Sequence, residues 1–176
     1  TTYGMVDVRD NGKVIRWYEK PSWNEATSRW VNIGACILEP EVLRYIPPNE
    51  QVSVERETFP FLIREKLPVF GFQSLDYWLD IGNAPKYLKG QRNILTGVIQ
   101  TNMTDGASSS NLRVGESTRI DNRVSIKGPV VIGDNCEIEP GAVLIGPTVI
   151  GNNVRIGRDT FVEESAIWDN CVLEEH

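Results

Sequence analysis

Residues 114–168 have the sequence VGESTRIDNRVSIKGPVVIGDNCEIEPGAVLIGPTVIGNNVRIGRDTFVEESAIW, in which an apolar residue returns at every sixth position. The apolar positions are Val114, Ile120, Ile126, Ile132, Ile138, Leu144, Ile150, Ile156, Val162 and Trp168. A small or β-branched residue lies four places after each: Thr118, Val124, Val130, Cys136, Ala142, Thr148, Val154, Thr160, Ala166 and Val172. A period of six fits neither an amphipathic helix, with a period of about 3.6, nor a half-buried strand, with a period of about two. The stretch therefore predicts a coil built from short flat faces.

The pattern resembles the left-handed parallel β-helix of the hexapeptide-repeat proteins. Three hexapeptides would make the three faces of one turn, so we expect turns of about 18 residues and an array of a little over three turns. One bulky side chain per face would point inward, and a small one near each corner would let the chain turn. Cys136 occupies one of these small positions, so we expect it to pack in the interior. Continued past Trp168, the period places Glu174 inward, and we expect the array to end there without a clear cap.

The net charge of −6 is concentrated on the repeat array. Residues 1–111 carry 12 Lys and Arg against 13 Asp and Glu, whereas residues 112–176 carry 6 against 11. Because nucleic-acid binding needs clustered cations, we expect no nucleic-acid partner. The three cysteines and the absence of a signal-like or membrane-length apolar run favour the reducing cytoplasm and no membrane association.

The first hundred residues have the pattern of a mixed α/β region. We expect a hairpin whose strands, 3–8 and 14–18, flank the turn residues Asp10-Asn11-Gly12. A buried strand is expected at 31–38, followed by a short helix at 40–45 that Pro40 begins. A second helix is expected at 58–66, with strands at 69–72 and 77–79.

Asn83 is expected to cap a further helix that ends near Leu95, with Pro85 in its first turn and Gly97 just beyond it. Residues 100–111 are rich in Thr, Asn, Gly and Ser, a composition typical of linkers. The expected organisation is therefore an α/β part at residues 1–99, a linker at 100–111 and the β-helix at 112–176.

Three short motifs in the α/β part are candidates for chemistry: Glu19-Lys20-Pro21 after a strand, Asn32-Ile33-Gly34 within one, and WLDIG at 78–82 before a helix. Each alone is common in turns, caps and close-packed strands. In this order, as EKP, NIGACILEPEVL and YWLDIGNAPKYLKGQRNIL before a hexapeptide array, they resemble the second half of the sugar-1-phosphate nucleotidylyltransferases. That family includes the mannose-1-phosphate guanylyltransferases and the glucose-1-phosphate thymidylyl-, uridylyl- and adenylyltransferases.

The resemblance implies transfer of a nucleotidyl group from a nucleoside triphosphate to a sugar 1-phosphate, with Mg²⁺ and with release of pyrophosphate. It implies catalytic roles for Lys20 and Asp80: Lys20 would contact the sugar phosphate as a cation, and Asp80 would bind the metal ion. Glu19 would accept hydrogen bonds from sugar hydroxyls, and Asn32 and Gly34 would line the sugar subsite together with Glu19 and Lys20. Positioning and electrostatic stabilisation supply most of the catalysis in such transfers.

The chain departs from this family in one large respect. Family members begin with a nucleotide-binding half that carries a glycine-rich G-x-G-T-R-L-x-P loop and a further metal-binding aspartate, and neither occurs here. We therefore expect this chain to be inactive alone, either as a piece of a longer protein or as one whose other half comes from another chain.

The sequence is also compatible with two other functions. Hexapeptide arrays also build acyltransferases, which typically use a histidine as general base, but the single histidine here is His176 at the last position. The chain could also be a non-catalytic assembly or regulatory subunit. Whichever function holds, we expect a homo-oligomer assembled through the β-helix, because its open ends and flat faces favour subunit contacts.

Overall fold

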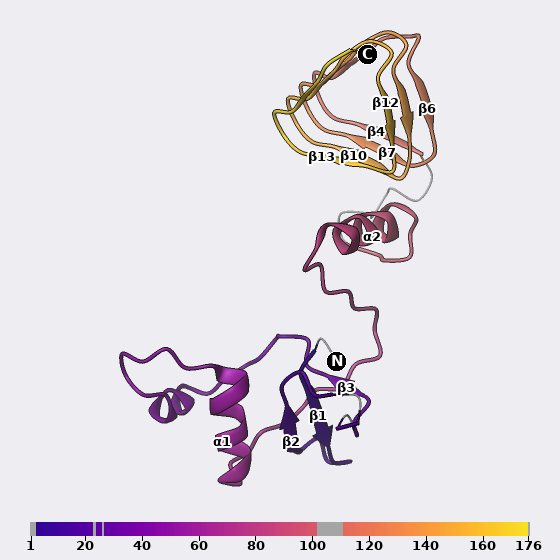
Figure 1. The fold of residues 1–176 in the computed structure, drawn as a ribbon. Coiled ribbons are helices and arrows are strands. Elements are labelled where there is room, and N and C mark those ends of the chain that lie inside the picture. The colour runs from indigo at the N-terminus through magenta and orange to yellow at the C-terminus, as the bar shows by residue number, and fades with distance from the viewer. Residues whose placement is uncertain (1–2, 23, 26, 102–110, 176) are drawn as a thin grey trace. The chain divides into compact units, whose positions relative to one another are not determined.

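A computed structural model describes residues 3–22, 24–25, 27–101 and 111–175 of the chain (Figure 1). The chain folds as two compact units, Thr1–Asp76 and Tyr77–His176. The first is a mixed α/β unit, and the second contains a helix and a parallel β-helix. Within the described residues, no helix is long and apolar enough to cross a membrane.

The first unit is built on a three-stranded antiparallel sheet in the order β2-β1-β3. The predicted hairpin is confirmed: β1 (Met5–Val8) pairs with β2 (Val14–Tyr18), and β1 also pairs with the short β3 (Trp30–Val31). Three short helices follow: the 3-10 helix η1 (Pro40–Tyr45), the π-helical turn η2 (Val54–Thr58) and α1 (Phe59–Arg64). The small core of this unit consists of Met5, Val6, Val14, Phe59 and Leu62.

Of three further strands predicted for the first hundred residues, one is formed only at its first residue and two are not formed. The expected strand 31–38 ends at Val31, because Gly34 adopts a φ of +81° and Ile37 and its neighbours have no strand beside them among the described residues. Residues 69–72 contribute only an isolated bridge between Phe70 and Lys13, and residues 77–79 have no regular structure. A strand needs a partner for its backbone N–H and C=O groups, so an apolar segment without one remains irregular.

The second unit contains the predicted parallel β-helix, with three faces arranged as a triangular coil (Figure 1). Three parallel sheets form these faces, in the orders β13-β10-β7-β4, β14-β11-β8-β5 and β12-β9-β6. The strands are β4 (Leu112–Val114), β5 (Arg119–Ile120), β6 (Ser125–Lys127), β7 (Val130–Ile132), β8 (Glu137–Ile138), β9 (Val143–Ile145), β10 (Thr148–Ile150), β11 (Arg155–Ile156), β12 (Phe161–Glu163), β13 (Ala166–Ile167) and β14 (Val172–Leu173). Residues 18 apart are paired in the first turns, for example Val130 with Thr148.

Side chains at two of the small-residue positions form hydrogen bonds to backbone carbonyls of the coil. Cys136 is 2% exposed, which confirms its interior position, and its thiol donates to Gly151 O at 3.0 Å. The buried Thr148 donates in the same manner to Ile145 O at 2.6 Å. A small polar side chain is tolerated here because it donates to a backbone carbonyl, so that its own buried hydrogen is not left without a partner.

A ladder of Asp and Asn side chains explains the glycines that follow the bulky residues. Asn152 Oδ1 accepts from the backbone N–H of Asp134 at 2.8 Å, and Asp169 Oδ1 accepts from that of Asn152 at 2.7 Å. A Cβ on Gly133 would lie 2.5 Å from Asn152 Oδ1, and one on Gly151 would lie 2.2 Å from Asp169 Oδ1. Glycine is therefore required where the ladder oxygen of the next turn approaches the backbone.

The last turn of the β-helix is one residue shorter than the sixfold pattern predicts. Ile150 pairs with Ile167, and Ile156 pairs with Leu173, each 17 residues apart. The inward positions of this turn are therefore Ile167, Cys171 and Leu173, which pack against the core. The predicted inward positions of Trp168 and Glu174, and the predicted small-residue positions of Ala166 and Val172, are wrong: Trp168 is 68% exposed.

Helix α2 (Ala84–Leu95) confirms the predicted cap, because Asn83 Oδ1 accepts from the backbone N–H of Lys86 at 3.0 Å. The helix lies against the β-helix in the same unit. Gln91 Nε2 donates to Ser165 O at 3.0 Å, and Arg92 forms an ion pair with Glu164. Of the predicted linker 100–111, residues 102–110 lie outside the described residues.

Candidate functional site

The predicted residue Glu19 lies over the sheet of the first unit, beside Gly4 and Asn32. Glu19 directly follows β2, and Gly4 directly precedes β1. The backbone N–H of Asn32, just after β3, donates to Gly4 O at 2.8 Å. Antiparallel pairing thus brings one terminus of each of the three strands to the same end of the sheet. The carboxylate of Glu19 lies at this end.

The carboxylate of Glu19 is nearly buried but incompletely bonded. Its side chain is 13% exposed, and Oε2 has no hydrogen-bond partner among the described residues. A Cβ on Gly4 would lie 2.9 Å from this Oε2, so Gly4 provides the space in which the carboxylate sits. An unpaired buried carboxylate oxygen costs free energy, and such an atom in a folded protein is a candidate for ligand contact.

Lys20 lies beside Glu19 and is largely exposed. Its backbone adopts a φ of +49°, which turns the chain sharply after Glu19, and its side chain is 58% exposed. Lys20 Nζ lies 3.8 Å from Glu19 Oε1, so it approaches the other carboxylate oxygen and not the unpaired Oε2. The pair therefore presents a cation in solvent next to a carboxylate held against the sheet.

Asn32 and Gly34 are brought together, and a residue that the motifs did not indicate joins them. Asn32 Oδ1 accepts from the backbone N–H of Gly34 at 3.0 Å, and Asn32 Nδ2 donates to Glu55 Oε1 at 2.6 Å. Glu55 belongs to η2, which is remote in sequence, and Gly4 precedes the hairpin. The sequence signals that could have identified these two residues are weak: a glycine directly before a strand, and an acidic residue in the segment SVERETFP.

An apolar groove of about 790 Å³ opens beside Asn32 in the same unit. Its lining includes Ile33, Cys36, Tyr45 and Phe59. Cys36 is exposed as a residue, but desolvation of its thiol in the groove, and secondarily the negative charge of Glu55, raise the pKa of this thiol above its ordinary value. Cys36 is therefore held as the neutral thiol near neutral pH, and it is not an activated nucleophile.

Asp80 belongs to the second unit, where it precedes α2. Its carboxylate is 41% exposed, and Oδ2 accepts from Lys86 Nζ at 3.1 Å. Within the described residues, no group of three or more His, Cys, Asp and Glu side chains is arranged to hold a metal ion. Mg²⁺ is commonly bound by one or two carboxylates, with substrate phosphates and water completing the shell, and an exposed Asp80 fits the carboxylate role in such a site.

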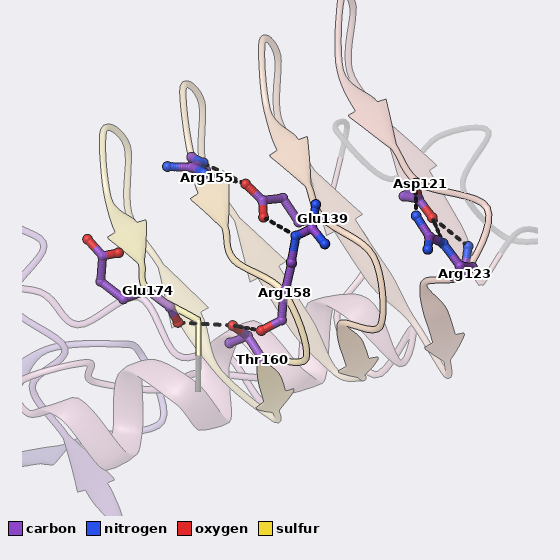
Figure 2. A network of polar contacts seen from close by, with 7 residues as sticks. All are labelled: Asp121, Arg123, Glu139, Arg155, Arg158, Thr160 and Glu174. Carbon is purple, nitrogen blue, oxygen red and sulfur yellow. Dashed lines mark hydrogen bonds and ion pairs between the residues drawn. The ribbon is translucent and has the colours of Figure 1, made fainter.

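A second polar surface lies on the β-helix, over the sheet β14-β11-β8-β5 (Figure 2). It forms a hollow of about 500 Å³ lined mainly by charged residues. The Glu139 carboxylate accepts a hydrogen bond from Arg155 Nε at 2.9 Å and forms an ion pair with Arg158 Nε at 3.7 Å. The Asp121 carboxylate accepts from Arg123 Nε at 2.9 Å.

Hydrogen bonding to these partners lowers the pKa of Asp121 and raises that of Arg155. The lining also includes Glu137, Glu174 and Glu175, so carboxylates outnumber the three arginines. Since every arginine of this hollow already pairs with a carboxylate, the surface is a network of internal ion pairs and lacks free cations for an anionic ligand.

The two sets of candidate residues have different chemical capacities. Glu19, with Asn32 and Gly4, offers acceptors and a backbone edge suited to hydroxyl groups, and Lys20 offers a point charge suited to a phosphate. Asp80 offers a hard oxygen ligand suited to a divalent cation.

Comparison with known proteins relates both units to sequence families. Residues 1–97 match the family described as nucleotidyl transferase, and residues 111–146 and 132–164 match the bacterial transferase hexapeptide family (six repeats).

Among curated proteins, the chain is 35% identical over 138 residues to a UTP–glucose-1-phosphate uridylyltransferase of Synechocystis, which covers 76% of the chain and 35% of that protein. It is 39% identical over 172 residues to a mannose-1-phosphate guanyltransferase of Pichia angusta, covering 96% of the chain and 44% of that protein. A mannose-1-phosphate guanylyltransferase of Mycobacterium tuberculosis is 28% identical over 132 residues, or 74% of the chain and 36% of that protein. The chain thus spans less than half the length of these relatives.

Proposed function

Because the chain belongs to the nucleotidyl transferase family, we propose that its first unit binds the sugar 1-phosphate in a sugar-1-phosphate nucleotidylyltransferase. The complete reaction would transfer a nucleotidyl group from a nucleoside triphosphate to the sugar 1-phosphate and release pyrophosphate. This chain would supply the sugar-phosphate subsite and one metal ligand, and it would not catalyse the reaction alone.

The single observation that carries the proposal is the orphaned oxygen of Glu19. Its Oε2 is buried against the space left by Gly4 and has no partner among the described residues. A sugar hydroxyl would donate the missing hydrogen bond, and a bond to a charged acceptor is stronger than one between neutral groups. The binding of ligand would therefore recover free energy that the unliganded unit loses at this position.

The neighbouring residues have roles that follow from their positions. Lys20, exposed beside Glu19, would contact the phosphate oxygens of the same ligand through its ammonium group. Asn32 is oriented by Glu55, and its side-chain Oδ1 accepts from the Gly34 N–H, so this loop would line the sugar subsite with a fixed shape. Proton transfer by these residues is not needed, because nucleotidyl transfer depends mainly on positioning and charge stabilisation.

Among the residues of this chain, Asp80 would bind Mg²⁺ through its carboxylate. When bound, the ion would stabilise negative charge on the phosphates. The role of the protein residues is to hold the carboxylate: Lys86 pairs with Asp80 Oδ2 at 3.1 Å, and the N-cap of Asn83 fixes the first turn of α2 next to it.

Titration of the 176-residue chain with glucose 1-phosphate and mannose 1-phosphate, followed by NMR, tests the sugar-phosphate subsite. We expect weak binding with shifts at the Gly4, Glu19 and Asn32 resonances, and about tenfold weaker binding for Glu19→Gln, because the amide removes the charged acceptor. Glu50→Gln is the matched control, since Glu50 is exposed in the same unit.

Two results would contradict this assignment. Equal affinity for the wild type and Glu19→Gln would exclude Glu19 as a sugar ligand. Nanomolar affinity for either sugar phosphate would contradict a site that holds only part of the substrate contacts.

The β-helix is proposed to assemble the chain into homo-oligomers. The sheets end at β12, β13 and β14 on one side of the β-helix, and these edge strands have no further partner among the described residues. Exposed edges are usually covered by another element or subunit. Analytical ultracentrifugation at increasing concentration tests this, and a monomer at high concentration would refute it.

A further inference from the structure

The short last turn of the β-helix coincides with the surface to which α2 binds. The turn loses one residue between Val162 and Ile167, and within this interval Glu164 adopts a φ of +43°. The contraction brings Ile167 to the interior and directs Trp168 outward, where its ring meets that of Tyr87 edge-on at a centroid distance of 6.1 Å.

Two polar contacts complete this surface. The carbonyl of Ser165 accepts from Val149 N at 3.0 Å, as part of the β-helix, and also from Gln91 Nε2 at 3.0 Å. The carboxylate of Glu164 pairs with Arg92. The contacts of Tyr87, Gln91 and Arg92 with the β-helix therefore fall on residues 164–168, where the sixfold register of the described turns is interrupted.

The same helix holds the segment that contains Asp80. Tyr77 Oη accepts from Asn93 Nδ2, and Asp80 Oδ2 accepts from Lys86 Nζ at 3.1 Å. Between these two contacts the segment lies directly on the helix at Gly90, where a Cβ would be 3.4 Å from Ile81 Cγ2 and 3.6 Å from Leu79 Cδ2. Residues 77–81 are thus fixed along one side of α2.

We propose that the shortened turn, residues 164–168, is a docking site for α2, and that Gln91, Arg92 and Trp168 are positioning residues that hold Asp80 in a fixed orientation to the β-helix. The chain of contacts is continuous within one unit: the docking site contacts α2, and α2 contacts the Asp80 segment. A regular sixfold turn would bury an apolar side chain at position 168, so this contact depends on the contraction. The catalytic meaning of the positioning rests on the metal-binding role proposed for Asp80.

Residual dipolar couplings of the 176-residue chain test this proposal, because they report orientation. We expect the backbone couplings of Leu79–Gly82 and of α2 to fit the same alignment as those of the β-helix. In Arg92→Glu, where like charges face each other, we expect these couplings to shrink by about half as the helix gains motion. The double variant Arg92→Glu/Glu164→Arg should restore them, since it re-forms the ion pair in reverse.

A second pair of variants separates docking from folding. Trp168→Ala should reduce the couplings of Leu79–Gly82, whereas Trp168→Phe, which keeps a ring for Tyr87, should retain them. Val172→Ala is the control, because Val172 is also an outward apolar residue of the last turn. The couplings of the β-helix itself should be unchanged in every variant.

Either of two outcomes would overturn the proposal. One is that Leu79–Gly82 do not share the alignment of the β-helix in the wild type, and the other is that Arg92→Glu and Trp168→Ala leave their couplings unchanged. Neither outcome depends on ligand or metal binding. A failed sugar-phosphate titration would therefore refute the proposed function and leave this result standing.

Discussion

Glu19→Gln is expected to make the ligand-free first unit more stable while it weakens sugar-phosphate binding. The substitution keeps the size of the side chain and removes its charge. In the wild type, Oε2 is buried without a partner, and leaving a buried polar atom unpaired costs about 1–3 kcal/mol, with a larger cost for a charged group. A neutral amide in the same place is cheaper to bury.

One interaction opposes this gain. Glu19 loses its ion pair with Lys20, but the two groups are 3.8 Å apart and the lysine side chain is 58% exposed. Such exposed pairs contribute about 0–1 kcal/mol, so the desolvation term is the larger of the two. The net expectation is a rise of about 1 kcal/mol in the free energy of unfolding.

Urea unfolding at neutral pH measures this change, with the NMR signal of the Trp17 indole N–H as the probe of the first unit. Trp17 lies on β2, two residues before Glu19, and its ring is 4.6 Å from that of Phe59. Glu50→Gln should shift the midpoint only slightly. A loss of more than about 1 kcal/mol in Glu19→Gln would show that the carboxylate is stabilised in the unliganded unit, and the argument from its orphaned oxygen would fail.

Three further predictions concern packing and reactivity. Leu144→Ala should lower the free energy of unfolding of the β-helix by about 2–5 kcal/mol, because Leu144 is fully buried, whereas Val172→Ala should have little effect in the same circular-dichroism titration. Gly133→Ala should destabilise the β-helix by at least about 1 kcal/mol, since its Cβ would lie 2.7 Å from the backbone of the next turn; an unchanged melting temperature would contradict this. The raised pKa of Cys36 predicts slow alkylation by iodoacetamide at pH 8, with a rate that increases as the pH rises toward that pKa. Glu55→Gln should accelerate the reaction by removing a nearby negative charge, and equal rates would argue against this charge effect.

The β-helix could be predicted in outline because its repeat is local. A period of six decides which residues of each face point inward, and the buried Ile132, Leu144 and Ile150 confirm it. The same logic failed in the last turn, where the strict period continued to Trp168 but the pairing of Ile150 with Ile167 set a different register. Ile167 and Trp168 are both apolar, so this position alone did not distinguish the two registers.

The sequence motifs indicate only some of the residues of the candidate site. The motif at Glu19 and Lys20 could be recognised in the sequence, as could Asn32 and Gly34. Gly4 and Glu55 could not, because each contributes from a separate element that reaches the cluster through strand pairing or packing. The strand expected at 31–38 was wrong for a related reason: apolar composition alone does not supply a neighbouring strand.

The sequence by itself thus determined the kind of fold in each part, the cap of α2 and most of the candidate functional residues. These features depend on the order of side chains within a few residues, where periodicity and capping act. Only the tertiary structure decided the register of the last β-helix turn, the docking of α2 on residues 164–168 and the unpaired oxygen of Glu19. Those features depend on which distant segments approach each other, and that is settled by long-range hydrogen bonding and packing.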